Sequence, residues 1–296
     1  MNFFEFNKKF PTELACINYF IKVRYGEKVT CNHCKNVKVY RTKNEPKKFD
    51  CPNCKNHFSV FKDTIFEKSD TDLRKWFYAI HLFLNSKKGI SGYQLQREIC
   101  VTYKCAWRIL KQIRLAMGNE ASKELLGSLV EVDEAYVATE DKNDDEDNKP
   151  KRGRGTNKNV VVACVDRENK KVLAQVMPKN TEGQKLTGKQ LLDMISQVVL
   201  PNSTIISDEF KGYKIINKTT NYTHLTVNHS KGYVGTNGEH VNNVESFWGT
   251  LKRGIIGIYH HVSTNYLQSY VDEFCFRSNN RDNADVFNLL LKQAVL

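Results

Sequence analysis

Apolar residues between positions 70 and 117 recur at the three- and four-residue intervals that mark one face of an α-helix. The first run predicts a helix that Ser69 or Asp70 caps and that ends before Gly89. A short helix, a tight turn at 100–102 and a longer helix over 103–117 follow. The two apolar stripes are formed by Leu73, Trp76, Phe77, Ile80, Phe83 and Leu84, and by Ala106, Ile109, Leu110, Ile113 and Met117.

Beyond residue 125 the pattern changes to short apolar runs that predict strands. The expected order is three strands, one amphipathic helix, two strands and a final helix that starts at Asn242. This is the element order of a ribonuclease-H-like core. The elements before the final helix are expected over residues 129–137, 159–165, 171–177, 187–200, 203–208 and 225–228.

Four cysteines form two closely spaced pairs near the N-terminus. Cys31 and Cys34 have the C-x2-C spacing, as do Cys51 and Cys54, and sixteen residues separate the pairs. Each pair places two thiolates on one turn, and the spacer lets a hairpin join the turns around one tetrahedral zinc ion. A module of this size has too small a core to fold unaided, so zinc would supply folding energy. Four unrelated thiols are the alternative interpretation.

These patterns divide the chain into three domains, which gives a multidomain fold class that mixes α+β and α/β parts. We expect a zinc ribbon over residues 1–68, a helical helix-turn-helix segment over 69–124 and a ribonuclease-H-like catalytic core over 125–296. Within the core, a biased segment is acidic at 141–147 and basic at 149–155, which predicts a solvated, mobile loop.

The positive charge of the chain is concentrated in its first part. Residues 1–120 contain 23 Lys and Arg against 11 Asp and Glu, whereas the rest of the chain contains 22 of each, and the whole net charge is +12. Clustered positive charge favours binding to phosphate backbones. A merely soluble basic surface is the alternative interpretation of the charge alone.

The helix predicted over 103–117 carries basic side chains opposite its apolar stripe. These are Lys104, Arg108, Lys111 and Arg114. A short helix, a tight turn and a basic second helix are typical of a helix-turn-helix, which binds double-stranded DNA through the second helix. An ordinary helical hairpin with a solvated basic face is the alternative, and the neighbouring zinc ribbon favours DNA binding.

Length and composition argue against a membrane protein. No run of about 18 apolar residues occurs, and the first ten residues lack the basic-then-apolar pattern of a secretion signal. We therefore expect no membrane partner and a reducing compartment. That compartment is the bacterial cytoplasm, in association with the nucleoid, or the nucleus of a eukaryotic host. Nine cysteines there indicate metal ligands or buried thiols rather than disulfides.

Three carboxylates fall at characteristic places in the predicted core. Asp133 lies on its first strand, Asp208 at the end of its fourth strand and Glu245 on the late helix. Carboxylates that converge repel one another unless hard divalent cations neutralise them, and Mg²⁺ prefers oxygen ligands. Two such ions about 4 Å apart can activate a nucleophile and stabilise the leaving oxygen of a phosphodiester. The alternative is that each acid is simply solvated.

Two sequence motifs add a specific resemblance. The run Asp208-Glu209-Phe210-Lys211-Gly212-Tyr213 and the long run 240–263 are similar to the second and third acid motifs of DDE-superfamily insertion-sequence transposases. The branch concerned has an N-terminal zinc ribbon and is related to eukaryotic Merlin elements. The resemblance includes residues 133–136, 152–155 and 272–277, the ribbon and the helix pair, and thus nearly the whole chain. The acidic run 141–147 departs from the family.

The resemblance implies a site and a reaction. Asp133, Asp208 and Glu245 would bind two Mg²⁺ or Mn²⁺ ions, and Lys252 would be the auxiliary basic residue that holds a phosphate, with a surface lysine as the alternative. The enzyme would bind terminal inverted repeats, cleave DNA and join the ends to target DNA, as a homodimer or higher oligomer on DNA. The rival functions are a non-catalytic DNA-binding protein, a plain nuclease of the same fold and a zinc-ribbon transcription factor.

The third metal ligand remains a choice between two residues of one helical turn, Asn242 and Glu245. Members of the branch with asparagine at this position are known. We favour Glu245, because a carboxylate neutralises a divalent cation and because it stands seven residues before Lys252. Asn242 then fits as the N-cap of the helix, where its side chain would accept exposed amide hydrogens.

Overall fold

The computed structural model describes residues 1–119, 124–139, 158–178, 186–227 and 240–295. The chain forms two units. One consists of residues 1–119 and 282–296, and the other of residues 120–281. The acidic and basic runs predicted to form a loop lie outside the described residues.

The N-terminal unit begins with two capped helices and a small antiparallel sheet. The Asn2 and Thr12 side chains accept hydrogen bonds from amides in the first turns of the two helices, which fixes where each begins. In the sheet, the buried Phe49 pairs with the buried Phe58 and supplies a small apolar core. The elements are α1 (Phe3–Lys9), α2 (Glu13–Tyr25), β1 (Tyr40–Arg41), β2 (Lys48–Asp50) and β3 (His57–Ser59).

Three further helices follow the sheet, and their apolar stripes are buried as the sequence pattern predicts. The first begins two or three residues later than expected, because Asp72 rather than Ser69 or Asp70 caps it. Between the second and third, Cys100 adopts a left-handed conformation (φ 50°), and Thr102 caps the next helix. The predicted short helix, turn and longer helix are thus present. Their bounds are α3 (Leu73–Asn85), α4 (Gly92–Ile99) and α5 (Tyr103–Met117).

The C-terminal helix α9 (Val286–Gln293) belongs to this first unit, so the predicted domain boundaries need correction. Its residues Leu290 and Leu291 are fully buried, and the helix packs with α2, α3 and α5. The chain that follows it also pairs with the unit, because the Ile65 amide donates to the Ala294 carbonyl at 3.0 Å. The second unit therefore ends before residue 282, and the ribbon and the helices form one unit.

The second unit is built on a five-stranded sheet with the strand order β6-β5-β4-β7-β8. Strand β5 pairs antiparallel with both β4 and β6, whereas β7 pairs parallel with both β4 and β8. The order of these strands along the chain is the one predicted for a ribonuclease-H-like core. The strands are β4 (Leu129–Val137), β5 (Asn159–Asp166), β6 (Val172–Val176), β7 (Thr204–Ser207) and β8 (Thr223–Thr226).

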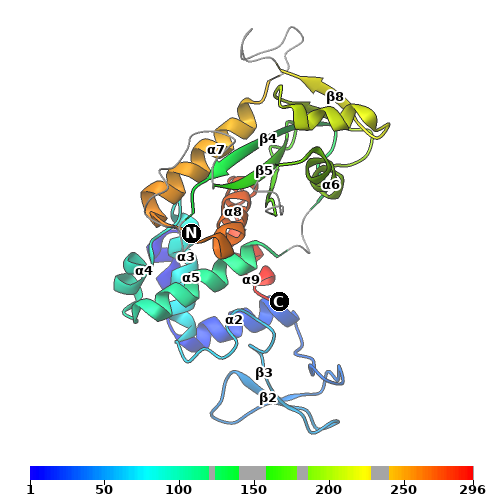
Figure 1. The fold of residues 1–296 in the computed structure, drawn as a ribbon. Helices are drawn as coiled ribbons and strands as arrows, with labels where there is room; N and C mark the ends of the chain where they lie inside the picture. The colour runs from blue at the N-terminus through cyan, green and yellow to red at the C-terminus, as the bar shows by residue number, and fades with distance from the viewer. Residues whose placement is uncertain (120–123, 140–157, 179–185, 228–239, 296) are drawn as a thin grey trace. The chain divides into compact units, whose positions relative to one another are not determined.

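Helices cover both faces of this sheet (Figure 1). One face packs on α6 (Gly188–Val198) and the 3₁₀ segment η2 (Lys211–Lys218), and the other on α7 and α8. Strand β5, which lies between β6 and β4, is buried along its whole length because both of its faces are covered. The second group consists of α7 (Asn242–Gly254), the π-helical segment η3 (Ile255–Tyr259) and α8 (Thr264–Asn279).

Strand alternation decides which β4 side chains reach which face. Val130 and Val132 join the core beneath α6, whereas Ala135 and Val137 join the core beneath α7 and α8. Asp133 therefore lies on the α7 side of the strand. The parallel register pairs Leu129 of β4 with Thr204 of β7, which brings Asp208, just past the end of β7, level with Asp133.

Candidate active site and zinc site

The four paired cysteines converge in the N-terminal unit. The sulfur atoms of Cys31, Cys34, Cys51 and Cys54 all lie within 4.8 Å of one another. The Sγ atoms of Cys31 and Cys54 are 3.6 Å apart, as are those of Cys34 and Cys51. The predicted ribbon is confirmed, and its four thiols fit the tetrahedral ligand set of one structural zinc ion.

The two cysteine turns share one backbone pattern. The residue after each turn, Lys35 or Lys55, has a positive φ and donates its amide to the carbonyl of Cys31 or Cys51 at 3.0 Å. The pKa of the Cys31 thiol is lowered to about 6. The largest cause is a hydrogen bond from the Cys34 backbone amide, which lowers the pKa more than burial raises it. A lowered pKa favours the thiolate, which is the form that binds zinc.

The basic residues predicted on α5 divide into two groups. Lys104 and Lys111 are exposed, and Lys111 lies over the Trp107 ring with its Nζ 5.5 Å from the centroid. Arg108 is half-buried and donates to the Glu67 carbonyl at 2.9 Å. Arg114 is only 3% exposed, so its predicted place on a DNA-contacting surface is wrong. Its guanidinium packs on the Phe83 ring instead, because the helix is buried around more of its circumference than one stripe.

In the second unit, three carboxylates converge where β4 and β7 run side by side. Oxygen atoms of Asp133, Glu134 and Asp208 lie within 4.8 Å of one another. Asp208 accepts the Phe210 amide at 2.9 Å, a local bond that orients its side chain at the strand end. Glu134 accepts a 2.9 Å hydrogen bond from the buried Tyr213 hydroxyl. Such a set of oxygens fits hard divalent cations.

Asp133 is the most strongly perturbed member of this group. Burial is the largest cause that raises its pKa to about 6, and the charges of Asp208 and Glu245 act in the same direction. The Trp248 indole donates to its Oδ2 at 3.0 Å, which opposes the rise. A carboxylate that is destabilised by neighbouring negative charge is one that gains from a bound cation.

A family model for the ISXO2-like transposase domain matches residues 124–279, just over half of the chain. The chain belongs to the ISXO2-like transposase family. A model for the transposase zinc-ribbon domain matches residues 11–57 and spans both cysteine pairs. The chain is thus a DDE transposase with an N-terminal zinc ribbon and a ribonuclease-H-like core.

Two proteins that are similar to the transposase come from Halobacterium salinarum and Haemophilus influenzae. A protein of the transposable element ISH50 of Halobacterium salinarum is 27% identical over 281 residues, which are 91% of this chain and 92% of the relative. A transposase-like protein of Haemophilus influenzae is 27% identical over 105 residues, which are 36% of this chain and 82% of the relative. The first similarity extends over both units.

Solved structures that resemble the transposase share less sequence. The catalytic core domain of BIV integrase is 19% identical with a TM-score of 0.31, and the match covers 53% of this chain and 86% of that one. The Mos1 transposase in a pre-cleavage transpososome is 10% identical with a TM-score of 0.29, over 74% of this chain and 79% of that one. The fold of the transposase core is assigned from its own strand order and the family match.

Helix α7 of the transposase carries the remaining predicted site residues. Glu245 lies in its first turn and Lys252 in its last, and both are exposed. Their seven-residue separation places them on one face of the helix. Glu245 is near enough to Asp133 to raise its pKa, although the 4.8 Å cluster found among the described residues contains Glu134 in its place.

Asn242 does not have the capping role that the sequence suggested. It is the first helical residue of α7, and the N-cap position is Val241. Its side chain is exposed. The prediction failed because the carboxylate of Glu131 on β4 accepts the amides of Asn243 and Val244 in the first turn. No local sequence pattern indicates that contact.

Glu134, Tyr213 and Trp248 also belong to the site, although the sequence pattern did not indicate them. Glu134 directly follows Asp133, and this pairing of acids was an available signal. Tyr213 and Trp248 lie within the two motifs but are 79 and 115 residues away from the acids that they contact. Contacts at such separations follow from the strand order and not from spacing.

Asp133→Asn is expected to stabilise the transposase when no Mg²⁺ or Mn²⁺ is present. The folded pKa of about 6 lies above the ordinary value of 3.8, so the charged side chain destabilises the folded state, and stability falls as pH rises through this range. At about pH 7.5 the zinc-loaded variant should melt a few degrees above the unaltered protein, and the difference should vanish near pH 4. A lower melting temperature at both pH values would contradict this account.

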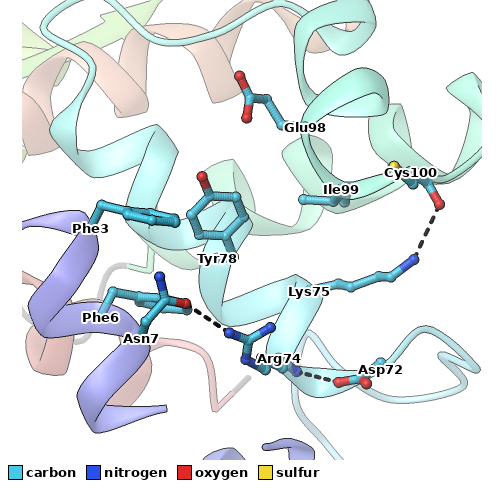
Figure 2. Close-up of a pocket in the computed structure, with 10 residues that line it drawn as sticks. All are labelled: Phe3, Phe6, Asn7, Asp72, Arg74, Lys75, Tyr78, Glu98, Ile99 and Cys100. Carbon is cyan, nitrogen blue, oxygen red and sulfur yellow. Dashed lines mark hydrogen bonds between the residues drawn. The ribbon is translucent and has the colours of Figure 1, made fainter. Parts of the chain in front are cut away.

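One cavity of about 380 Å³ lies in the first unit (Figure 2). Aromatic rings of α1 and α3 form one side, and the end of α4 forms the other. Its two basic side chains are engaged, because Arg74 donates to Asn7 and Lys75 donates to the Cys100 carbonyl. It contains neither the cysteine cluster nor the carboxylates. Its lining residues are Phe3, Phe6, Asn7, Asp72, Arg74, Lys75, Tyr78, Glu98, Ile99 and Cys100.

Among the described residues, no helix combines the length and the apolar character needed to cross a membrane.

Proposed function

We propose that this transposase binds the terminal inverted repeats of its element, cleaves DNA there and joins the freed ends to target DNA. The observation that carries the proposal is the convergence of Asp133 and Asp208 at neighbouring strands of the core. In the same chain, the four thiols of the ribbon and the basic α5 provide parts suited to DNA recognition.

The chain's own residues would prepare the reaction. Asp133 and Asp208 would hold two Mg²⁺ or Mn²⁺ ions together with Glu245 as third ligand. Such ions, when bound, activate water as a nucleophile and stabilise the leaving oxygen of the phosphodiester. The Trp248 indole orients the Asp133 carboxylate, and Lys252, on the Glu245 face of α7, would hold a phosphate beside the cleavage point.

The recognition parts would act before the chemistry. The exposed Lys104 and Lys111 of α5 would contact phosphates, and the ribbon, with one zinc ion, would add a second contact surface. Because two transposon ends must be joined in one event, we propose a homodimer or higher oligomer on DNA. The finished event would be cleavage by water to leave a 3′-hydroxyl, followed by attack of that hydroxyl on a target phosphodiester.

The test of cleavage uses DNA that contains the repeats flanking the gene. Purified protein should cut this DNA at the repeat boundary in Mg²⁺, leave a 3′-hydroxyl and leave scrambled repeats intact. Binding without any cleavage in Mg²⁺ or Mn²⁺ would favour a non-catalytic DNA-binding protein and would contradict the proposal.

Lys104→Ala and Lys111→Ala are each expected to weaken binding to repeat DNA and to flatten its salt dependence. Each lost phosphate contact should reduce the slope of log affinity against log salt by about one. Binding measured over a salt series gives both quantities. The matched control is Lys8→Ala, which removes an exposed lysine of α1 that is distant from α5 in the sequence. If both substitutions leave affinity and slope at the control values, α5 is a structural helix.

A further inference from the structure

Glu131 is a fully buried carboxylate on β4, two residues before Asp133 and on the same side of the strand. Its oxygen Oε2 accepts the backbone amides of Asn243 at 2.9 Å and Val244 at 3.1 Å. Its oxygen Oε1 accepts the Asn243 side-chain amide at 2.7 Å. Both oxygens of one β4 carboxylate are therefore bound to the first turn of α7.

Two basic groups complete the surroundings of this carboxylate. Arg167, in the turn after β5, donates its Nε to Glu131 at 2.8 Å and an Nη to the His240 carbonyl at 2.6 Å. The His240 ring nitrogen Nδ1 lies 3.2 Å from the same carboxylate. A buried carboxylate is costly unless it is paired and hydrogen-bonded, and here charge and donors are both supplied.

The contact replaces a local helix cap. The first amides of a helix lack partners within the helix and are usually bound by the side chain of the N-cap residue. Val241 occupies the N-cap position of α7 and makes no capping side-chain hydrogen bond. Among the described residues, the only first-turn amide with a local side-chain partner is that of Asn242, which donates to the His240 ring nitrogen Nδ1 at a long 3.4 Å. Glu131 performs that function for the Asn243 and Val244 amides from strand β4, and its negative charge suits the positive end of the helix.

A second contact joins the same strand and helix one turn further along. Trp248 of α7 donates to Asp133 at 3.0 Å. Glu131 and Asp133 are thus two points on β4 that hold residues 243–244 and 248 of α7. Two points at different heights fix both the rotation and the axial position of the helix, and Glu245 lies between them.

We propose that Glu131 is a positioning residue that places α7, and with it Glu245, against Asp133 for metal binding. Glu131 itself faces the helix amides and would not touch the metal. The proposal rests on the proposed function of Asp133, Asp208 and Glu245 as metal ligands.

The test compares Glu131→Ala and Glu131→Gln with a matched control, Asp166→Ala. Asp166 is also a buried carboxylate of this sheet, and it accepts the amides of Glu168 and Asn169 at 2.8 and 3.0 Å, at the turn after β5. Two quantities are measured on zinc-loaded protein, namely hydrogen exchange of the Asn243 and Val244 amides and Mn²⁺ affinity by calorimetry. An Asp133→Asn protein identifies the heat that belongs to this site.

Glu131→Ala is expected to speed exchange of the two amides by about tenfold or more and to weaken Mn²⁺ binding by about 10- to 100-fold. Glu131→Gln keeps one acceptor oxygen and should lie between Glu131→Ala and the unaltered protein, and it also serves if the alanine variant does not fold. Asp166→Ala should change neither quantity.

Unchanged Mn²⁺ affinity in a Glu131 variant with fast amide exchange would overturn the positioning role. Unchanged exchange would overturn the capping contact itself. If the unaltered protein binds no Mn²⁺ at the Asp133 site while the exchange results are as expected, the proposed function fails and the capping contact stands.

Discussion

Glu245→Gln is expected to reduce Mg²⁺-dependent cleavage of repeat DNA by about a thousandfold or more while DNA affinity stays within about twofold. A bound metal stabilises the transition state by several kcal/mol, and each 1.4 kcal/mol or so corresponds to a factor of ten in rate. The amide keeps the size of the side chain and removes only its charge. Single-turnover cleavage rates and binding isotherms on the same DNA give the two quantities.

Asn242→Ala and Glu134→Gln are the comparison variants for this assignment. Asn242 is exposed and does not cap α7, so its substitution should change stability by no more than about 0.5 kcal/mol and leave cleavage intact. Glu134 lies within 4.8 Å of Asp133 and Asp208, but it is bound to the buried Tyr213 hydroxyl, so Glu134→Gln should retain measurable cleavage. Loss of cleavage in Glu134→Gln or Asn242→Ala with an active Glu245→Gln would assign the third ligand differently.

Cys31→Ser is expected to release the zinc ion, unfold residues 28–60 and weaken binding to repeat DNA. The ribbon has only a few buried apolar side chains, among them Phe49 and Phe58, so metal binding supplies most of its folding free energy. Elemental analysis of the purified protein should find one zinc per chain before the substitution and substantially less after it. Cys54→Ser, from the other turn, should behave in the same way.

Cys105→Ser is the matched control for the ribbon. Cys105 is a half-buried free thiol on α5, and its substitution should leave the zinc content at one ion per chain. If the unaltered protein contains no zinc, or if Cys31→Ser retains zinc and full DNA affinity, the metal is not what folds the ribbon.

Much of the fold could be predicted from the sequence because its signals are local. The period of the apolar stripes predicts α3 and α5, and the C-x2-C spacing predicts the ribbon. The short β-type runs predict the order of strands and helices along the core. Asp133 and Asp208 could be placed in one site because adjoining strands of this architecture end near each other.

The parts that the sequence did not predict depend on contacts between distant segments. Glu131 lies 112 residues before Asn243, whose amide it accepts, and nothing in the motif of either segment indicates that contact. Arg114 was expected to be exposed because only one stripe of α5 was assumed to be buried, yet it packs on Phe83. The affiliation of α9 with the first unit likewise depends on tertiary packing of an ordinary amphipathic helix.

The transposase account is tested most directly by strand transfer. Purified protein, Mg²⁺, DNA fragments that end in the repeats flanking the gene and a supercoiled plasmid are incubated together, and covalent joining of fragment to plasmid is measured. We predict joined products with the unaltered protein and none with Asp208→Asn. Cleavage of the repeats without any joining, or joining that persists in Asp208→Asn, would contradict the account.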